Sequence, residues 1–530
     1  MIYCTYVRAY EHSRKYFFFE REMTLLYLYG TVPYSKVHGI FSLWWIYLYV
    51  IDKMKESSSL PITVATSLIG ATIVAGIFFS YNRHIGTQSK EVDCKKEENN
   101  DNKVVSHELS FTDTYMYNTN VPVICTLTWF KGDFRDAKVQ LEKQMTSLME
   151  KNPWLLSRIV KDKKCPFNYR MSYSTPKDYK DILHEYLMAL EPQESPITRE
   201  CPFDKIGTKI YKSHPDLFLS NSTKVPIFRV TILPCSQNPH QNFGVMVQLS
   251  HTVSDGATYY QILHMLLTKD SSNIIPLNAQ RIFNSEEIQQ TLLGKAEYDA
   301  MKSIGSTVRI IRGVISSLMS RQPFCFRFGW VDPLKIKQVK EIALQNQNEE
   351  TGTKVQFVST NDVITSWFMN QSKCDYGYMA INWRGRIEGH SMLNAGNYEN
   401  VIYYQKEDFN CPTLIRRSIN GREQKTTTTN GDQSRIMYKR AVTHNSKVPG
   451  LMEGFTTKCG VVTNWSSFAQ PNEIEGCEED LHLPVSFLEI FPTTIALLII
   501  FRGGPGKIGV CYGHASGPNL LDDCPFLMKE

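Results

Sequence analysis

The chain has 530 residues, of which 42% are hydrophobic and 21% are charged, and its formal net charge is +5. This balance is typical of a globular protein with two or three domains and excludes a wholly disordered chain. No run of Lys and Arg interleaves with aromatic residues, so the sequence argues against a nucleic-acid partner. The 13 cysteines are scattered singly, which argues against a disulfide framework and against a zinc site. We therefore expect no metal.

The N-terminal region predicts a membrane anchor. Residues 61–81 carry no charge, and about 20 helical residues at ~1.5 Å each span the ~30 Å hydrocarbon core of a bilayer. A buried core helix and a cleaved signal peptide are the alternatives to a transmembrane helix over 61–81. An N-terminal extension, 1–60, precedes this segment and contains a second hydrophobic stretch at 39–51, which is a second span, an interfacial helix or an artefact of the assigned start. A charged, Asn-rich linker, 82–108, follows the span. More Lys and Arg flank the span on its C-terminal side, which favours a cytosolic location for the rest of the chain.

The first half of the globular region shows alternating strand and helix patterns. Leu141, Met145 and Leu148 have the spacing of one helix face, and Asn152-Pro153 ends this helix. Two apolar segments, 227–233 and 243–249, predict strands, and the second is apolar enough to be central in a sheet. A helix is predicted over 257–267.

The second half contains a helix, a loop and a closing pair of strands. Ser359 to Asp362 has the side-chain oxygens of a helix N-terminus, and we expect this helix to run to about Gln371. Residues 425–434 predict an exposed loop, and 495–501 and 508–512 predict two strands joined by a glycine-rich turn. Strands and helices mix without a repeated βαβ period, which indicates an α/β fold of α+β layers and excludes a barrel.

The segment from Ser250 to Gly256, Ser-His-Thr-Val-Ser-Asp-Gly, carries the residues best suited to chemistry. His251 follows the central strand, and a neutral imidazole with an ordinary pKa of ~6.5 suits a general base near neutral pH. Asp255 lies four residues later, where its carboxylate has the option of bracing the loop against a distant arginine. Gly256 is expected to permit the tight turn after the strand. The alternative is a structural histidine at a strand end.

Five blocks in order resemble the superfamily of chloramphenicol acetyltransferase, plant BAHD acyltransferases, wax-ester synthases and peptide-synthetase condensation domains. The resemblance covers most of residues 109–512. The blocks are residues 151–159 (KNPWLLSRI), 226–232 (PIFRVTI), 245–256 (VMVQLSHTVSDG), 359–367 (STNDVITSW) and 380–386 (AINWRGR) followed by Gly396-Asn397.

The resemblance implies two pseudo-symmetric domains, 109–290 and 291–530, with the active site in a channel between them. It implies His251 as the general base and Asp255 as the brace of its loop. Arg384 is the better candidate for the partner of Asp255, and Arg386 is the alternative. The resemblance also implies that Asn397, in the Gly396-Asn397 turn, supports the site.

The chain departs from the BAHD pattern because it lacks Asp-Phe-Gly-Trp-Gly. At the corresponding place stands Thr463-Asn-Trp-Ser-Ser467, which is more similar to the Ser-Asn block of wax-ester synthases or to a hydroxyl-bearing strand of the smaller acetyltransferases. Asn464 and Ser466 are candidates for stabilising a tetrahedral oxyanion. The other interpretation is that they only hold a strand that crosses between the domains. Residue 250 is Ser, so the double histidine of wax-ester synthases and condensation domains is absent.

These observations predict transfer of an acyl group from acyl-CoA to a hydroxyl or amine acceptor, with acyl-CoA as co-substrate and no cofactor. The predicted membrane anchor favours a lipophilic acceptor and an enzyme at the endoplasmic reticulum with its catalytic part facing the cytosol. We expect a monomer. Two alternatives are a carrier-dependent condensation-type enzyme and a membrane-tethered scaffold that has the fold without the chemistry.

Overall fold

The computed structural model describes residues 104–118, 123–198, 200–219, 225–285, 287–289, 303–320, 325–346, 355–419, 424–427, 433–436, 449–485, 492–514 and 519–528. They belong to one compact unit of the chain, residues 95–530. The predicted extension 1–60, the predicted span 61–81 and the linker up to residue 103 lie outside the described residues. Within the described ranges, no helix combines the length and the apolar character that crossing a bilayer requires.

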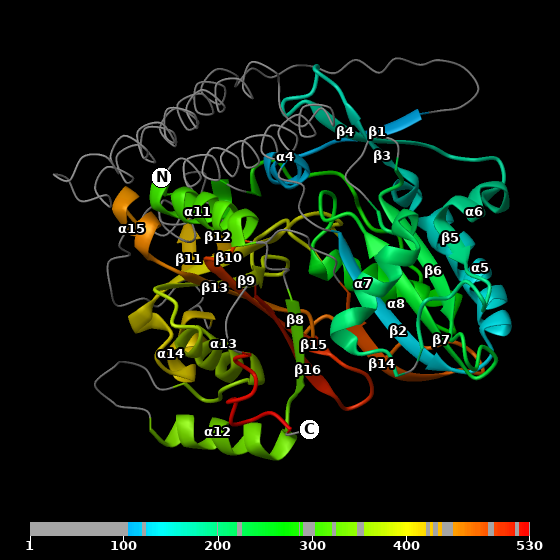
Figure 1. Ribbon diagram of the computed structural model, residues 1–530. Helices are drawn as coiled ribbons and strands as arrows, with labels where there is room; N and C mark the ends of the chain where they lie inside the picture. The colour runs from blue at the N-terminus through cyan, green and yellow to red at the C-terminus, as the bar shows by residue number, and fades with distance from the viewer. Residues whose placement is uncertain are drawn as a thin grey trace, which may run out of the picture. The chain divides into compact units, whose positions relative to one another are not determined.

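A five-stranded sheet forms the first large layer (Figure 1). Its strands pair antiparallel except for the parallel pair β5·β6. In spatial order they are β14 (Glu478–Pro484), β2 (Ile124–Lys131), β7 (Asn242–Leu249), β6 (Phe228–Pro234) and β5 (Leu187–Ala189). The predicted central strand is confirmed, because seven of the eight residues of β7 are buried.

Two helices cover one face of this sheet, and capping side chains place their starts. Helix α5 (Phe134–Lys151) begins at the N-cap Asp133, and its C-cap is Asn152, which confirms the predicted helix end. Helix α8 (Gly256–Leu266) begins at the N-cap Asp255, and nine of its eleven residues are buried. Apolar side chains of both helices pack on those of β6 and β7 in one core.

A six-stranded sheet forms the second large layer. Its strands are β10 (Glu399–Gln405), β9 (Tyr376–Asn382), β13 (Cys459–Asn464), β15 (Ile495–Arg502), β16 (Ile508–His514) and β8 (Cys325–Trp330). One face packs on α12 (Pro333–Gln345), α13 (Thr360–Gln371) and α14 (Pro412–Ile419). Helix α13 begins as predicted, with a capping box between Ser359 and Asp362.

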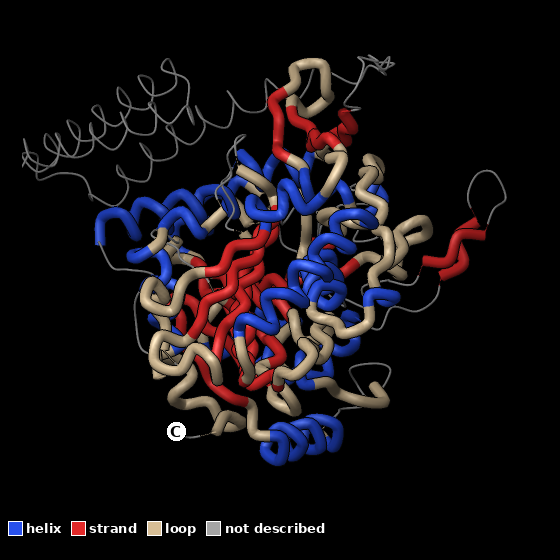
Figure 2. The backbone as a smooth tube through the Cα atoms, turned by 90° about the vertical axis from the view of Figure 1, so that its right-hand side faces the viewer, coloured by secondary structure: helices blue, strands red, loops and turns tan. Residues whose placement is uncertain are grey.

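The other faces of the two sheets share a third core. Trp129 and Met246 of the first sheet belong to the same buried cluster as Phe501 and Cys511 of the second. Helix α7 (Phe203–Ser213) adds Ile206 to that cluster. The strands of the two large sheets therefore lie in the interior, with helices around them (Figure 2).

Strand β14 corrects the predicted crossing strand. The predicted segment Thr463–Ser467 begins in β13, which pairs in parallel with β9 and β15 and so stays in the second sheet. The chain then crosses, and β14 pairs antiparallel with β2 in the first sheet. The crossing strand is therefore Glu478–Pro484, and the predicted boundary between residues 290 and 291 does not separate the strands of the two sheets completely.

Two further expectations are wrong. The end of the predicted linker is a strand, β1 (Val104–Glu108), in a three-stranded sheet with β4 (Tyr169–Ser174) and β3 (Arg158–Lys161). The predicted loop 425–434 contains most of an antiparallel pair, β11 (Gln424–Thr427) and β12 (Gln433–Ile436). Polar composition alone does not distinguish an exposed hairpin from a loop, and backbone pairing decides between them.

The remaining described helices are α4 (Phe111–Asn118), α6 (Leu183–Tyr186), α11 (Ile304–Ser320) and α15 (Leu451–Thr456), besides short 3-10 turns.

An ion pair links the crossing strand to the second sheet and yields a stability prediction. Glu479 of β14 accepts two hydrogen bonds from Arg502 of β15, at 2.6 and 2.7 Å, and its side chain is 4% exposed. Removing one partner leaves a buried charge, so Glu479→Ala should lower the free energy of unfolding by about 3–5 kcal/mol in urea denaturation. The control is its neighbour Glu478, 71% exposed and 3.5 Å from Lys131, where Glu478→Ala should cost about 1 kcal/mol or less. Equal losses in both variants would contradict this assignment.

Candidate active site

His251 lies on a turn between the central strand β7 and helix α8. The strand ends at Leu249 and the helix begins at Gly256, so the backbone of both elements fixes the two ends of the turn. The imidazole is half-buried, and its Nδ1 is a buried atom without a hydrogen-bond partner among the described residues. An imidazole nitrogen without a hydrogen-bond partner is available to exchange a proton with a bound molecule.

Four hydrogen-bond donors surround the carboxylate of Asp255. Oδ1 accepts from the Thr258 amide at 2.9 Å, and Oδ2 accepts from Arg384 Nη1 at 2.7 Å and from the amides of Tyr398 and Glu399 at 2.7 and 3.0 Å. Burial by itself would raise the pKa of this carboxyl, but the Arg384 charge and these hydrogen bonds outweigh it and hold the pKa below its usual value. Asp255 is therefore an anion that holds structure.

Arg384 uses every guanidinium nitrogen to tie chain segments together. Besides Asp255, it donates to the Asn394 and Gly396 carbonyls at 2.9 Å each, to Thr258 Oγ1 at 2.8 Å and to Asn382 Oδ1 at 3.1 Å. Arg384 follows strand β9, so the ion pair links the second sheet to the start of α8. Of the two predicted candidates, Arg384 and not Arg386 is the partner of Asp255.

Asn397 holds the His251 turn directly. Its Nδ2 donates to the backbone carbonyls of His251 and Thr252, at 3.0 and 2.9 Å, and to Asp113 Oδ1 at 2.8 Å. The predicted support residue therefore contacts the main chain of the predicted base.

The expected need for glycine at position 256 is not met in the structure. Gly256 is the first residue of α8, and its φ is not in the left-handed region, so the turn does not require glycine. A Cβ placed there would lie 3.5 Å from both carboxylate oxygens of Glu399 and 3.5 Å from Cδ1 of Trp465. These are ordinary van der Waals separations, so a methyl group at position 256 would fit between these two side chains.

Trp465 brings the segment Thr463–Ser467 to the start of α8, since its ring also lies edge-on to Tyr260 with centroids 6.2 Å apart. Within the segment, Asn464 Oδ1 accepts from the Ser466 amide at 3.0 Å and from Ser466 Oγ at 2.7 Å. The amide N–H must face an oxygen, so the Asn464 side chain is oriented with its Nδ2 pointing away from Ser466. Asn464 Nδ2 is consequently the available donor, and the Ser466 hydroxyl proton is engaged. That both residues face the His251 imidazole stays a prediction.

Sequence reasoning missed three charged residues at this site. Asp113 and Arg281 form a buried ion pair beside the His251 turn. Glu399, the first residue of β10, accepts from the Ala257 amide at 3.0 Å, and no described basic side chain forms an ion pair with it. Burial and the neighbouring Asp255 charge raise the pKa of Glu399 to about 8, against a smaller opposing effect of Arg384. No pattern in the sequence around Glu399 indicates that its carboxyl is placed beside Asp255 or that its pKa is raised.

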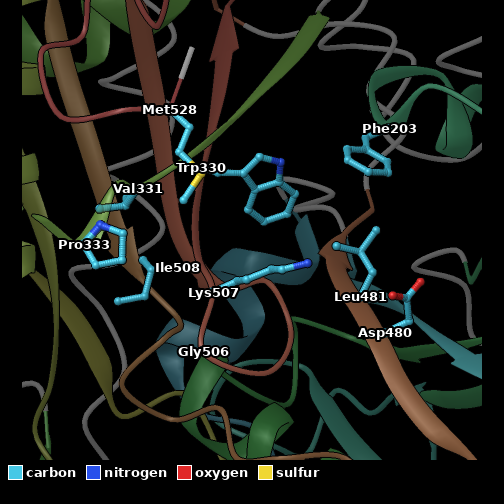
Figure 3. Close-up of a pocket in the computed structure, with 10 residues that line it drawn as sticks. All are labelled: Phe203, Trp330, Val331, Pro333, Asp480, Leu481, Gly506, Lys507, Ile508 and Met528. Atoms are coloured by element: carbon cyan, nitrogen blue, oxygen red, sulfur yellow. The ribbon is translucent and has the colours of Figure 1, made fainter. Parts of the chain in front are cut away.

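A separate cavity of about 290 Å³ lies at the far edge of the second sheet and contains none of the predicted site residues. Its walls come from the start of α7, the end of β8, strand β14 and the turn between β15 and β16. Apolar side chains such as Trp330 and Leu481 dominate them, and Lys507 extends toward the space between these two (Figure 3).

The raised pKa of Glu399 predicts a pH-dependent stability. Between its ordinary value of 4.5 and about 8, the native state holds a proton that the unfolded chain has released, so this residue's contribution to stability falls as the pH rises through that window. Glu399→Gln removes this dependence. The melting temperature of Glu399→Gln minus that of the unsubstituted protein should therefore become more positive from pH 5 to pH 8. The control is Glu388→Gln at an exposed position, whose difference should stay constant. A Glu399→Gln difference that is flat with pH would contradict the prediction.

Neither a family model nor a curated protein matches the sequence. Solved structures similar to the chain include polyketide synthase associated protein 5 from Mycobacterium tuberculosis, at 11% identity and TM-score 0.49 over 78% of this chain and 95% of that one. TRI101 of F. graminearum, complexed with coenzyme A and deoxynivalenol, is similar at 8% identity and TM-score 0.47, over 78% and 95%. The first condensation domain of the CDA synthetase is similar at 11% identity and TM-score 0.45, over 77% and 90%. At such identities, and with TM-scores under 0.5, these likenesses establish neither the family nor the activity of this chain.

Proposed function

We propose that the chain is an acyl-CoA-dependent acyltransferase of the chloramphenicol acetyltransferase-like superfamily, with His251 as general base and a hydroxyl or amine as acceptor. The observation that carries the proposal is the division of roles inside one loop. His251 sits half-buried with an unsatisfied nitrogen, while Asp255 is turned away and fully occupied by Arg384 and backbone amides. Such a loop supplies one base at a fixed position and no competing carboxylate.

The proposed reaction begins when His251 removes the acceptor's proton as the acceptor attacks the thioester carbonyl. The tetrahedral intermediate carries an oxyanion, and Asn464 Nδ2 is the proposed donor to it. Ser466 supports this role because its amide and hydroxyl hold the Asn464 side chain in one orientation. Collapse of the intermediate expels the CoA thiolate, which takes the proton from His251. The step balances without a metal or redox cofactor.

The role of Asp255 is to fix the loop and not to polarise the imidazole. Its carboxylate caps α8 and accepts from Arg384, which follows strand β9, so the pair ties the loop and the helix to the second sheet. Preorganisation of this kind lowers the cost of bringing a base into line with its substrate. Arg384 is thereby a positioning residue.

We further propose that the catalytic residues lie in a channel between two domains, 109–290 and 291–530, with acyl-CoA and acceptor entering from opposite sides. Residues 61–81 are proposed to anchor the enzyme in the endoplasmic reticulum membrane with the catalytic part in the cytosol. A lipophilic alcohol is then the favoured acceptor class, because it partitions into the same membrane. We propose a monomer.

Substitution of His251 tests the proposal. His251→Ala should lower the rate of CoA release from acyl-CoA, measured with a panel of lipophilic alcohols and amines, by at least ~100-fold, the loss expected for a missing general base. His264→Ala is the matched control, since His264 is a half-buried histidine on α8 and should keep activity within a few-fold. Circular dichroism checks that both variants fold. A His251→Ala variant as active as the control would refute the mechanism, and an unsubstituted protein inactive on the whole panel would favour a scaffold.

A further inference from the structure

We propose that Asp113 and Arg281 form a second brace that positions His251 by holding the carbonyls of three consecutive residues of its turn. This inference rests on the proposed function, because it names further positioning residues for the same base. It adds a device that is distinct from the Asp255–Arg384 pair in its charged residues and in the part of the loop that it holds.

The centre of the brace is a buried ion pair. Arg281 Nε donates to Asp113 Oδ2 at 2.6 Å, and the two side chains are 2% and 0% exposed. The remaining guanidinium nitrogens donate to main-chain carbonyls. Nη2 reaches the Val253 carbonyl at 3.0 Å, and Nη1 reaches those of Ala395 and Ala279 at 2.8 and 3.0 Å. A buried guanidinium with this many acceptors has one orientation available to it.

The other carboxylate oxygen of Asp113, Oδ1, links the brace to the carbonyls of the two residues before Val253. Oδ1 accepts from Asn397 Nδ2 at 2.8 Å, and the same amide group donates to the carbonyls of His251 and Thr252. The carbonyls of His251, Thr252 and Val253 are therefore each bound by a side chain that Asp113 itself holds. His251 is the first of these three residues, so the direction in which its imidazole points depends on how their backbone is held.

Asp113 is held in turn by its own helix start. Its Oδ2 accepts from the Ser110 amide at 3.0 Å, and its amide donates to Ser110 Oγ at 3.2 Å, a reciprocal pair at the start of α4. The Asp113 carboxylate thus belongs to helix α4, which is not part of either large sheet. The brace adds a third support to the two sheets that the Asp255–Arg384 pair connects.

The two braces meet on the segment before β10, at alternate carbonyls. Arg384 binds the carbonyls of Asn394 and Gly396, and Arg281 binds the carbonyl of Ala395 between them. Gly396 has φ +154°, and a Cβ there would lie 3.1 Å from Arg281 Nη1 and 2.9 Å from the Tyr398 ring. Glycine at this position therefore leaves room for the Arg281 guanidinium and the Tyr398 ring.

Loss of the Asp113 charge should misplace His251 without removing it. A displacement of about 1 Å at a reacting group costs up to ~100-fold in rate. Asp113→Asn is therefore expected to lower kcat by about 10- to 100-fold while KM changes by less than about 3-fold, because neither residue of the pair is proposed to contact substrate.

The matched control is a second buried Asp–Arg pair away from the loop. Asp362 has a fully buried side chain, caps α13 and accepts from Arg416 at 2.7 Å. Asp362→Asn removes a comparable pair from the second sheet's helical layer, so it should reduce stability and leave kcat within about 2-fold below its melting temperature. A general loss of stability would instead lower kcat equally in both variants, which would overturn the brace.

Two readouts need no substrate. Hydrogen–deuterium exchange at residues 251–254 should rise severalfold in Asp113→Asn and stay unchanged in Asp362→Asn, and the rate of diethyl pyrocarbonate modification of His251 should change in the first variant alone. If Asp113→Asn fails to fold, Arg281→Lys takes its place. This variant keeps a positive charge beside the Asp113 carboxylate but loses the two Nη groups that donate to the carbonyls of Val253 and Ala395. Unchanged exchange at 251–254 in the folded variant would refute the brace. A changed loop in a protein that transfers no acyl group would refute the proposed function and leave the brace standing.

Discussion

The carboxylate of Asp255 and the guanidinium of Arg384 meet at 2.7 Å in the protein interior, although 129 residues separate them in the chain. Breaking such a buried pair costs about 3–5 kcal/mol, since the remaining charge stays out of water. The pair is satisfied on all sides, by the α8 amide of Thr258, by the amides that begin β10 and by the carbonyls before it. The position of the His251 turn follows from this arrangement, because the turn has no regular structure of its own.

The site therefore lies where elements of both sheets end. The first sheet supplies β7 and the turn after it, and the second supplies the chain after β9, the start of β10 and the end of β13. Strand β14 and the Glu479–Arg502 pair join the two sheets near the end of β15. Because both sheets also share one apolar core, a shift of one sheet against the other would disturb packing and the candidate site together. Because of this coupling, the packing of both layers fixes the position of the His251 turn at their junction.

Local patterns in the sequence predicted the elements that carry the site. The resemblance of the Asn-Trp-Arg block singled out Arg384. Residue patterns alone predicted the central strand before His251, the helix over 257–267 and a capped helix start at Ser359 to Asp362. These succeed because strand burial and helix capping are set by neighbours in the chain. Asp113 and Arg281 were missed because they lie 168 residues apart, and neither sits in a pattern. Glu399 was missed because its pKa depends on burial beside Asp255, which a sequence does not display. The crossing strand was placed too early, since β13 and β14 are both short and only the pairing partner tells them apart.

The central claim is that acyl transfer occurs beside His251, and a crystal structure with a non-hydrolysable thioether analogue of acyl-CoA tests it most directly. We expect the analogue's sulfur near the His251 imidazole, with the position of the acyl carbonyl within about 3–3.5 Å of Asn464 Nδ2. An analogue bound only in the cavity lined by Trp330, Leu481 and Lys507, with no atom near His251, would contradict the account.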